Sequence, residues 1–278
     1  MNKKNYTVLF CIVLILFLVF GIVYILYMNS CQAKEKPYGV FLGINGDEQE
    51  KLDTYSIVII EPEAFTKEQI ADLKKDGKTV YGYLNIGAIE NYRSYYNRFQ
   101  SITLDVYENW PDERWIDVSN ENWQKFVVDE IGKTYVEMGF DGLFLDNTDV
   151  YYQYPKEEIY QGLCAILRGL KKYDITLMIN GGDTFVLRCI EEQIASELFD
   201  AVNQETVFTS IDFEDETYGM QNGEETVYFK EYLEIAKECG LSVYLLEYGA
   251  SPKLQKEIEQ YCEKNGYLWY NAKTLELR

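Results

Sequence analysis

The pattern of apolar and polar residues divides the 278-residue chain into one long apolar run and a series of short alternating segments. The run extends from Val8 to Met28 and is interrupted by no charged residue. Because a helix rises about 1.5 Å per residue, roughly 20 residues cross a hydrocarbon core of about 30 Å. The run therefore predicts an export or membrane-anchor element, and Lys3 and Lys4 in front of it predict that the N-terminus stays inside.

Two fates of this segment are open. Its length favours an uncut anchor, because the apolar core of a signal peptide usually spans about 7–15 residues. The alternative is lipid attachment at Cys31, because Met28 to Cys31 resembles a bacterial lipoprotein cleavage site. We expect residues 1–31 to be a signal peptide or anchor, 32–37 a tether, and 38–278 one domain outside the cytoplasm, membrane-anchored or secreted.

From Tyr38 onward, short β-branched or aromatic runs alternate with stretches of helical periodicity, a pattern typical of parallel strands joined by crossover helices. The predicted strands are Gly39–Leu42, Ser56–Ile60, Thr79–Leu84, Gly142–Leu145, Thr176–Ile179, Ala201–Gln204, Ser242–Leu246 and Tyr267–Tyr270. The predicted helices are Thr66–Lys75, Asn122–Met138, Glu157–Tyr173, Glu224–Glu238 and Pro252–Asn265. Eight such units in this length predict a single (β/α)8 barrel. An open doubly wound sheet is the alternative, but no glycine-rich phosphate loop follows the first strand.

Polar residues stand where six of the eight predicted strands end. They are Glu61, Asn85, Asp146, Asn180, Glu205 and Glu247. In (β/α)8 barrels the loops after the strands build the active site. We therefore expect a ligand site at this end of the barrel.

Composition narrows the chemistry of that site. The chain has no histidine, which excludes Ser-His-Asp and Cys-His nucleophile systems and histidine-based zinc sites. No Cys-x-x-Cys pair occurs, so we expect neither a metal nor another cofactor. We expect Cys164, Cys189, Cys239 and Cys262 to be buried free thiols, with one disulfide as the alternative.

The net charge is −20, and the first 31 residues hold two lysines and no acid, so the exported part carries about −22. Nucleic acid is therefore not an expected partner, whereas a cationic ligand would be attracted.

Carboxylates remain as catalytic groups, and two of them suffice for glycoside hydrolysis. Period-two alternation places Asp146 on the same strand face as Gly142 and Phe144, so its carboxylate should point into the barrel mouth. Glu205 shares a face with Ala201 and Asn203 in the same way. Asp146 and Glu205 are therefore the strongest candidates for catalytic carboxylates, with capping of the next turn as the alternative for Asp146 and a buried salt bridge as the alternative for Glu205.

The other strand-end residues and the tyrosines of the same loops are candidates for substrate binding, since flat rings with a polar edge suit sugar stacking. Glu61 and Glu247 could each hold a substrate amine or pair with a basic residue. The candidate substrate-binding residues are Glu61, Asn85, Asp149, Tyr151, Asn180, Glu247 and Tyr248.

Five sequence blocks together resemble glycoside hydrolase family 114, the endo-α-1,4-polygalactosaminidase family of (β/α)8 barrels. The blocks are Tyr83-Leu84-Asn85-Ile86-Gly87 with Glu90, Trp115-Ile116-Asp117-Val118, Gly139-Phe140-Asp141-Gly142 through Asp146-Asn147 with Asp149, Asn180-Gly181-Gly182, and Asn203-Gln204-Glu205. The resemblance implies that Asp146 and Glu205 are the catalytic pair, with Asp146 as nucleophile and Glu205 as acid/base by analogy with α-galactosidic barrels.

The implied function is retaining endo-hydrolysis of α-1,4-linked galactosamine or its partly N-acetylated form, a cationic amino-sugar polysaccharide. Retention predicts that the two carboxyl groups lie about 5–5.5 Å apart, whereas inversion would need roughly 6.5–9.5 Å. The alternative function is an exported barrel that binds such a polymer without cleaving it. Whether it is a hydrolase or a binding protein, we expect the chain to be attached to the membrane through residues 8–28 or through lipid on Cys31.

Overall fold

The computed structural model describes residues 36–278. The predicted export segment, Cys31 and residues 32–35 of the predicted tether lie outside these residues. Within 36–278, no helix combines the length and the apolar character that a membrane span needs.

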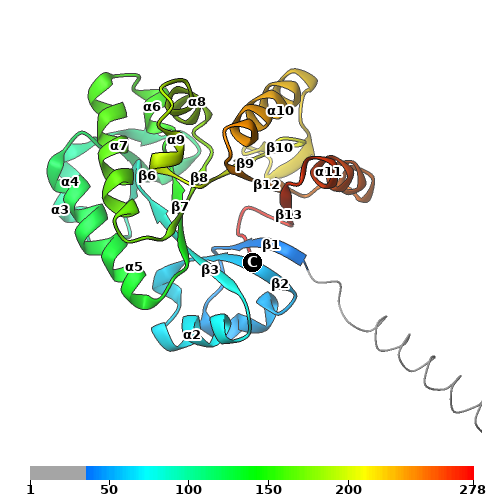
Figure 1. Ribbon diagram of the computed structural model, residues 1–278, viewed down its shortest axis with the longest axis horizontal. Helices are drawn as coiled ribbons and strands as arrows, with labels where there is room; N and C mark the ends of the chain where they lie inside the picture. Colours follow the sequence, from blue (N-terminus) through cyan, green and yellow to red (C-terminus); the bar gives the residue numbers. More distant parts are fainter. Residues whose placement is uncertain (1–35) are drawn as a thin grey trace, which may run out of the picture. The chain divides into compact units, whose positions relative to one another are not determined.

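Eight parallel strands form a nearly closed barrel, which confirms the predicted (β/α)8 fold (Figure 1). Each predicted strand is present, with ends shifted by at most three residues. The barrel strands are β1 (Lys36–Phe41), β2 (Tyr55–Ile60), β3 (Thr79–Asn85), β7 (Gly142–Asp146), β8 (Thr176–Asn180), β9 (Ala201–Glu205), β12 (Ser242–Tyr248) and β13 (Leu268–Ala272). They are hydrogen-bonded in this order, so each strand lies beside the next barrel strand of the sequence.

Helices surround the barrel on its outer side (Figure 1). The main ones are α2 (Lys67–Lys75), the run of α4 (Glu121–Lys125), π-helical η4 (Phe126–Gly132) and α5 (Lys133–Met138), then α7 (Glu157–Lys171), α8 (Asp183–Glu191), α10 (Gly223–Glu238) and α11 (Pro252–Asn265). Shorter helical turns are η1 (Gly46–Leu52), η2 (Pro62–Ala64), α3 (Tyr96–Phe99), η3 (Gln100–Ile102), α6 (Val150–Gln153) and α9 (Ala195–Leu198). Thr66 caps α2 by accepting from the Gln69 amide, and Ser251 caps α11 by accepting from the Leu254 amide, as helix-start signals predict.

The barrel interior is lined by aromatic rings and a few buried amides. Tyr38 of β1 donates a hydrogen bond to the Asn203 side chain of β9 at 3.0 Å, and its ring lies 4.9 Å from that of Tyr244 of β12. The first and last strands meet through the rings of Phe41 and Tyr270, whose centroids are 5.3 Å apart. Interior aromatics of this size bury large apolar areas, and the buried amides stay paired.

Two antiparallel insertions, neither predicted from the sequence, stand at the carboxyl ends of the barrel strands. The first follows β3 and consists of β4 (Ala88–Glu90), β5 (Thr103–Tyr107) and β6 (Trp110–Ile116). The second follows β9 and is a hairpin of β10 (Thr209–Asp212) and β11 (Thr217–Met220). Their tips touch through Trp110 and Phe213, whose rings meet edge to face at 6.3 Å. The insertions therefore add a second layer of side chains above the barrel mouth.

The cysteine prediction is correct in part. Cys164, Cys189, Cys239 and Cys262 are all free thiols. Cys239 is exposed, because it caps the solvent end of α10, whereas the other three are buried.

Candidate active site

Four strands end in the same way at the barrel mouth. The residue after each strand has a left-handed backbone, with φ of 66° at Asn147, 62° at Gly181, 54° at Thr206 and 58° at Gly249. This turn stops the strand abruptly, so the preceding side chain stays at the rim and points inward. Thr206 is β-branched and pays a conformational cost there. Its amide still donates to the Leu246 carbonyl at 2.9 Å, which helps to hold the strained turn.

Asp146, Asn180 and Glu205 end three consecutive strands and meet at their side chains. The Asn180 amide nitrogen donates to Asp146 Oδ1 and to Glu205 Oε1, each at 2.8 Å. The two carboxylate oxygens are therefore no farther apart than twice that distance. The Asn180 carbonyl oxygen accepts from the Asn203 amide at 2.7 Å, which fixes the direction in which its amide nitrogen points.

Tyrosines hold the outer oxygens of the same carboxylates. Tyr83 of β3 donates to Asp146 Oδ2, and Tyr248 of β12 donates to Glu205 Oε2, each at 2.8 Å. Both hydroxyls are inside the barrel, and burial together with the adjacent carboxylate keeps the pKa of each phenol well above its usual value. Four donors thus orient two carboxylates before any substrate arrives.

The two carboxyls differ in electrostatic setting. Burial raises the pKa of Asp146, while hydrogen bonds from Asn180, Tyr83 and the Asn147 backbone act against this rise. Burial and the charge of Asp146 raise the pKa of Glu205 to about 6, against hydrogen bonds from Asn180 and Tyr248. More donors stabilise the ionised form of Asp146, so Glu205 is the better candidate to keep a proton near neutral pH.

These side chains line a pocket of about 590 Å³, here called the catalytic pocket. Residues of both insertions form its upper wall, including Tyr107, Trp110, Glu113, Ser210 and Phe213. Six carboxyl groups line it but only one basic side chain does, and these seven are Glu61, Glu90, Glu113, Asp146, Asp149, Glu205 and Arg93. The pocket is therefore built to attract positive charge.

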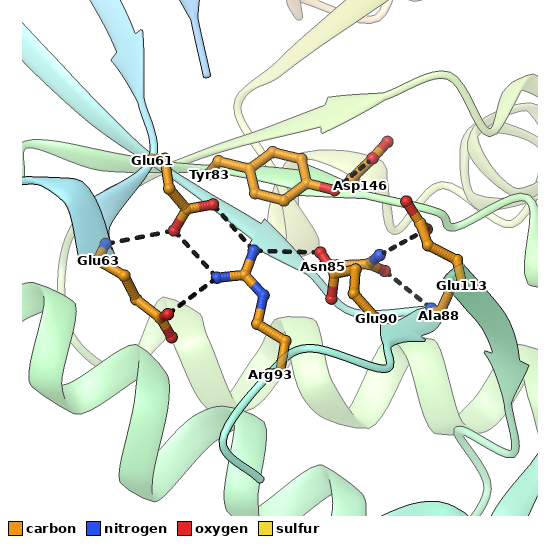
Figure 2. A network of polar contacts seen from close by, with 9 residues as sticks. All are labelled: Glu61, Glu63, Tyr83, Asn85, Ala88, Glu90, Arg93, Glu113 and Asp146. Carbon is orange, nitrogen blue, oxygen red and sulfur yellow. Dashed lines mark hydrogen bonds and ion pairs between the residues drawn. The ribbon is translucent and has the colours of Figure 1, made fainter. Parts of the chain in front are cut away.

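Glu61, predicted to bind substrate or to pair with a basic residue, lines the pocket and pairs with Arg93 (Figure 2). The guanidinium donates to both Glu61 oxygens at 3.1 and 2.9 Å and to Glu90 Oε1 at 3.1 Å. Glu90 is 2% exposed, and its second oxygen has no hydrogen-bond partner. The same guanidinium also pairs with Glu63 at 3.4 Å, so one arginine serves three carboxylates and one buried Glu90 oxygen stays unsatisfied.

Asn85 is not among the residues that line the catalytic pocket, and its role in binding substrate stays a prediction. Its amide nitrogen donates to Glu113 Oε2 at 3.2 Å, and its carbonyl oxygen accepts from the Ala88 amide at 2.8 Å (Figure 2). Asn85 therefore positions Glu113. Burial and the nearby charges of Glu90 and Asp146 raise the pKa of Glu113 to about 8.

Asp149 lies behind Asp146 at the start of α6 and lines the pocket. Burial and the charges of Asp146 and Asp183 raise its pKa to about 7. A Cβ added to Gly181 would come within 2.9 Å of Asp149 Oδ2, so the glycine leaves room for this carboxylate.

Two further candidates, Glu247 and Tyr151, are also absent from the pocket lining. Glu247 is fully buried and does not line the pocket. Its carboxylate accepts hydrogen bonds from the amides of Phe208 and Thr209 and from the Thr209 hydroxyl, which fixes the start of the second insertion. Burial raises its pKa to about 7, against those hydrogen bonds. Tyr151 does not line the pocket, and its hydroxyl accepts from Arg188 at 2.9 Å. Period two explains Glu247, since Leu246 and Tyr248 take the inward positions of β12.

Sequence reasoning missed Tyr83, Glu90, Arg93, Tyr107 and Glu113 as site residues. Tyr83 could have been predicted from the sequence, because it shares a strand face with Asn85. The insertion residues could not have been predicted, because their approach to Asp146 depends on how the chain folds back.

Within residues 36–278, no group of three or more acidic or cysteine side chains is arranged to hold a metal ion.

A (β/α)8 barrel with two carboxyls joined through one amide at its mouth has the architecture that glycoside hydrolases use. Residues 29–275 match glycoside-hydrolase family GH114. The chain belongs to this family, as its sequence blocks predict.

Individual relatives are distant. A protein of Deinococcus radiodurans that is described only as uncharacterized is 22% identical over 207 residues, or 70% of this chain and 64% of the relative. The chain thus spans less than two thirds of the length of that relative.

Solved structures share the fold. The glycoside hydrolase domain of PelA from Pseudomonas aeruginosa is similar with a TM-score of 0.73 and 17% identity, over 87% of this chain and 95% of that one. Ega3 of Aspergillus fumigatus, solved in complex with galactosamine, is similar with a TM-score of 0.69 and 15% identity, over 88% and 94%. An α-galactosidase of Thermus thermophilus reaches a TM-score of 0.56 at 11% identity, over 88% of this chain and 59% of that one.

Proposed function

We propose that the chain is an endo-acting hydrolase of α-1,4-linked galactosamine polysaccharide that retains anomeric configuration. The observation that carries this proposal is the shared amide of Asn180, which brings oxygens of Asp146 and Glu205 within twice 2.8 Å of each other. That limit on the two nearest oxygens is compatible with the separation of about 5–5.5 Å between carboxyl groups that is typical of retention.

In the proposed first step Glu205 donates its proton to the glycosidic oxygen while an Asp146 oxygen attacks the anomeric carbon. The bond to the leaving sugar breaks with its electron pair on that oxygen, and a covalent ester to Asp146 forms. In the second step Glu205, now ionised, takes a proton from water as the water displaces Asp146. Asn180, Tyr83 and Tyr248 keep both carboxylates in place throughout.

The substrate class is proposed from the charge of the pocket. An ammonium group carries three donors and no acceptor, which suits the acidic lining of the pocket and the Glu90 oxygen that has no hydrogen-bond partner. The galactosamine bound in the Ega3 structure is a cation of this kind. We therefore expect de-acetylated units to bind better than acetylated ones.

Salt tests this assignment. Screening lengths fall from about 10 Å at 0.1 M salt to about 3 Å at 1 M, so kcat/KM on de-acetylated polymer should drop over this range. On fully acetylated polymer it should change little, because that chain is neutral. An equal salt response on the two polymers, or cleavage of the neutral one alone, would show that the acidic residues serve solubility instead.

We also propose that the barrel acts outside the cytoplasm, held by residues 8–28 or by lipid on Cys31. Cell fractionation should find the intact protein in the membrane fraction, and Cys31→Ala should abolish lipid processing if the lipoprotein version holds. Unchanged processing and retention in Cys31→Ala would leave the uncut anchor, and recovery in the cytosol would contradict both versions.

A further inference from the structure

A second pocket of about 510 Å³ adjoins the catalytic pocket. Tyr107 and Asp149 line both, so the two pockets lie side by side at the barrel mouth. Its walls come from the first insertion on one side and from α6 with the residue after it on the other. The lining residues outside the shared pair are Asp105, Val106, Glu108, Asn109, Trp115, Tyr152, Gln153 and Tyr154.

This second pocket has the two features that an amino sugar needs. Tyr152 offers a ring that is 65% exposed, while Trp115 is buried and stacks on Tyr107 at 4.3 Å with an interplanar angle of 27°, which gives the pocket a rigid floor. Asp105, Glu108 and Asp149 supply carboxylates, and no lysine or arginine is among the lining residues. Aromatic rings match the apolar face of a sugar, and carboxylates match its ammonium group.

The pocket is also held together without a ligand. The Tyr154 hydroxyl donates to Asp105 Oδ2 at 2.7 Å and accepts from the Asp105 amide at 3.2 Å, which ties β5 to the loop after α6. The exposed ring of Tyr152 takes no part in this tie. Its exposure beside a preformed hollow marks a surface available to a ligand.

We infer that this second pocket is a distal subsite that binds a further galactosamine unit of the polymer whose scissile bond lies between Asp146 and Glu205. The inference rests on the proposed function and extends it, because a subsite beyond the catalytic pocket makes the enzyme favour long chains over short ones. Tyr152 would stack on the sugar, and Glu108 would face its ammonium group.

The test uses the full chain and galactosamine oligomers of defined length. Wild type should show a rise of kcat/KM with length that levels off once the second pocket is filled. Tyr152→Ala should lower the ratio of kcat/KM on long to kcat/KM on short oligomers about tenfold, which equals about 1.4 kcal/mol. The matched variant Tyr152→Phe keeps the ring and should preserve that ratio.

Glu108→Gln separates charge from stacking. It should lower the same ratio at low salt and have little effect at 1 M salt, whereas the effect of Tyr152→Ala should persist. If wild type cleaves the oligomers but Tyr152→Ala and Glu108→Gln leave the ratio unchanged, the distal subsite is wrong and the proposed function stands. If wild type cleaves none of them, the proposed function fails and the subsite with it.

Discussion

Asp146→Asn and Glu205→Gln should each lower the rate of cleavage of galactosamine polymer by orders of magnitude while the barrel stays folded. Both substitutions keep the shape of the side chain, but the first removes the attacking charge and the second removes the proton donor. A positioned acid or base contributes about 10²–10⁴-fold, and we expect losses of that order for Glu205→Gln and at least as large for Asp146→Asn. Release of reducing ends from the polymer measures the rate, and circular dichroism measures the fold.

Two exposed carboxylates on the helical run outside the barrel provide matched controls. Asp129→Asn and Glu137→Gln make the same chemical changes at exposed positions and should leave kcat unchanged. Full activity in Asp146→Asn or Glu205→Gln would refute the role assigned to that residue. An active Asp129→Asn beside an inactive, folded Asp146→Asn would locate the effect at the site.

The pH profile of the same variants tests which carboxyl is the acid. Glu205 must hold its proton to protonate the leaving oxygen, and its pKa is raised to about 6. The wild-type kcat/KM should therefore fall as pH rises above about 6, and residual activity of Glu205→Gln should lack this fall. A basic limb that persists in Glu205→Gln would assign the proton donor to another group.

The barrel was predictable from the sequence because its signals are local. Strands such as Ser56–Ile60 are short apolar runs, and caps such as Thr66 mark where helices begin. Asp146 and Glu205 were found by counting alternate positions along a strand, since period two decides which side chains face the barrel axis. The family resemblance added the pairing of these two residues and the sugar.

The second layer of the site depends on contacts that no local pattern reveals. Glu113 reaches the catalytic pocket only because β6 folds back beside β4, and it stands 28 residues after Asn85, the last residue of β3. Glu247 lies near the end of β12, as predicted, but its side chain is on the outward-facing side of the strand. There it accepts hydrogen bonds from the Thr209 hydroxyl and from two backbone amides. A position at the end of a strand thus indicates that a residue is near the site. Whether its side chain faces the pocket depends on which of the two alternating strand faces it occupies.

Arg93→Met should lower the free energy of unfolding more than the same substitution at an exposed arginine. The guanidinium is 5% exposed and pairs with Glu61 and Glu90, of which Glu90 is 2% exposed (Figure 2). Removing one partner leaves a buried charge uncompensated, which costs about 3–5 kcal/mol. Urea unfolding followed by tryptophan fluorescence would report this as a lower midpoint with an unchanged slope.

Arg98→Met is the matched control, because Arg98 makes an equally well-formed pair with Glu130 but both side chains are about half exposed. Water solvates Glu130 after the arginine is lost, so the free energy of unfolding should change far less. Adding Glu90→Gln to Arg93→Met should restore part of the lost stability, because it removes the charge that was left unpaired. Equal losses in Arg93→Met and Arg98→Met, or a further loss on adding Glu90→Gln, would mean that Arg93 stabilises the wall by packing and that the cluster of carboxylates tolerates its own charge.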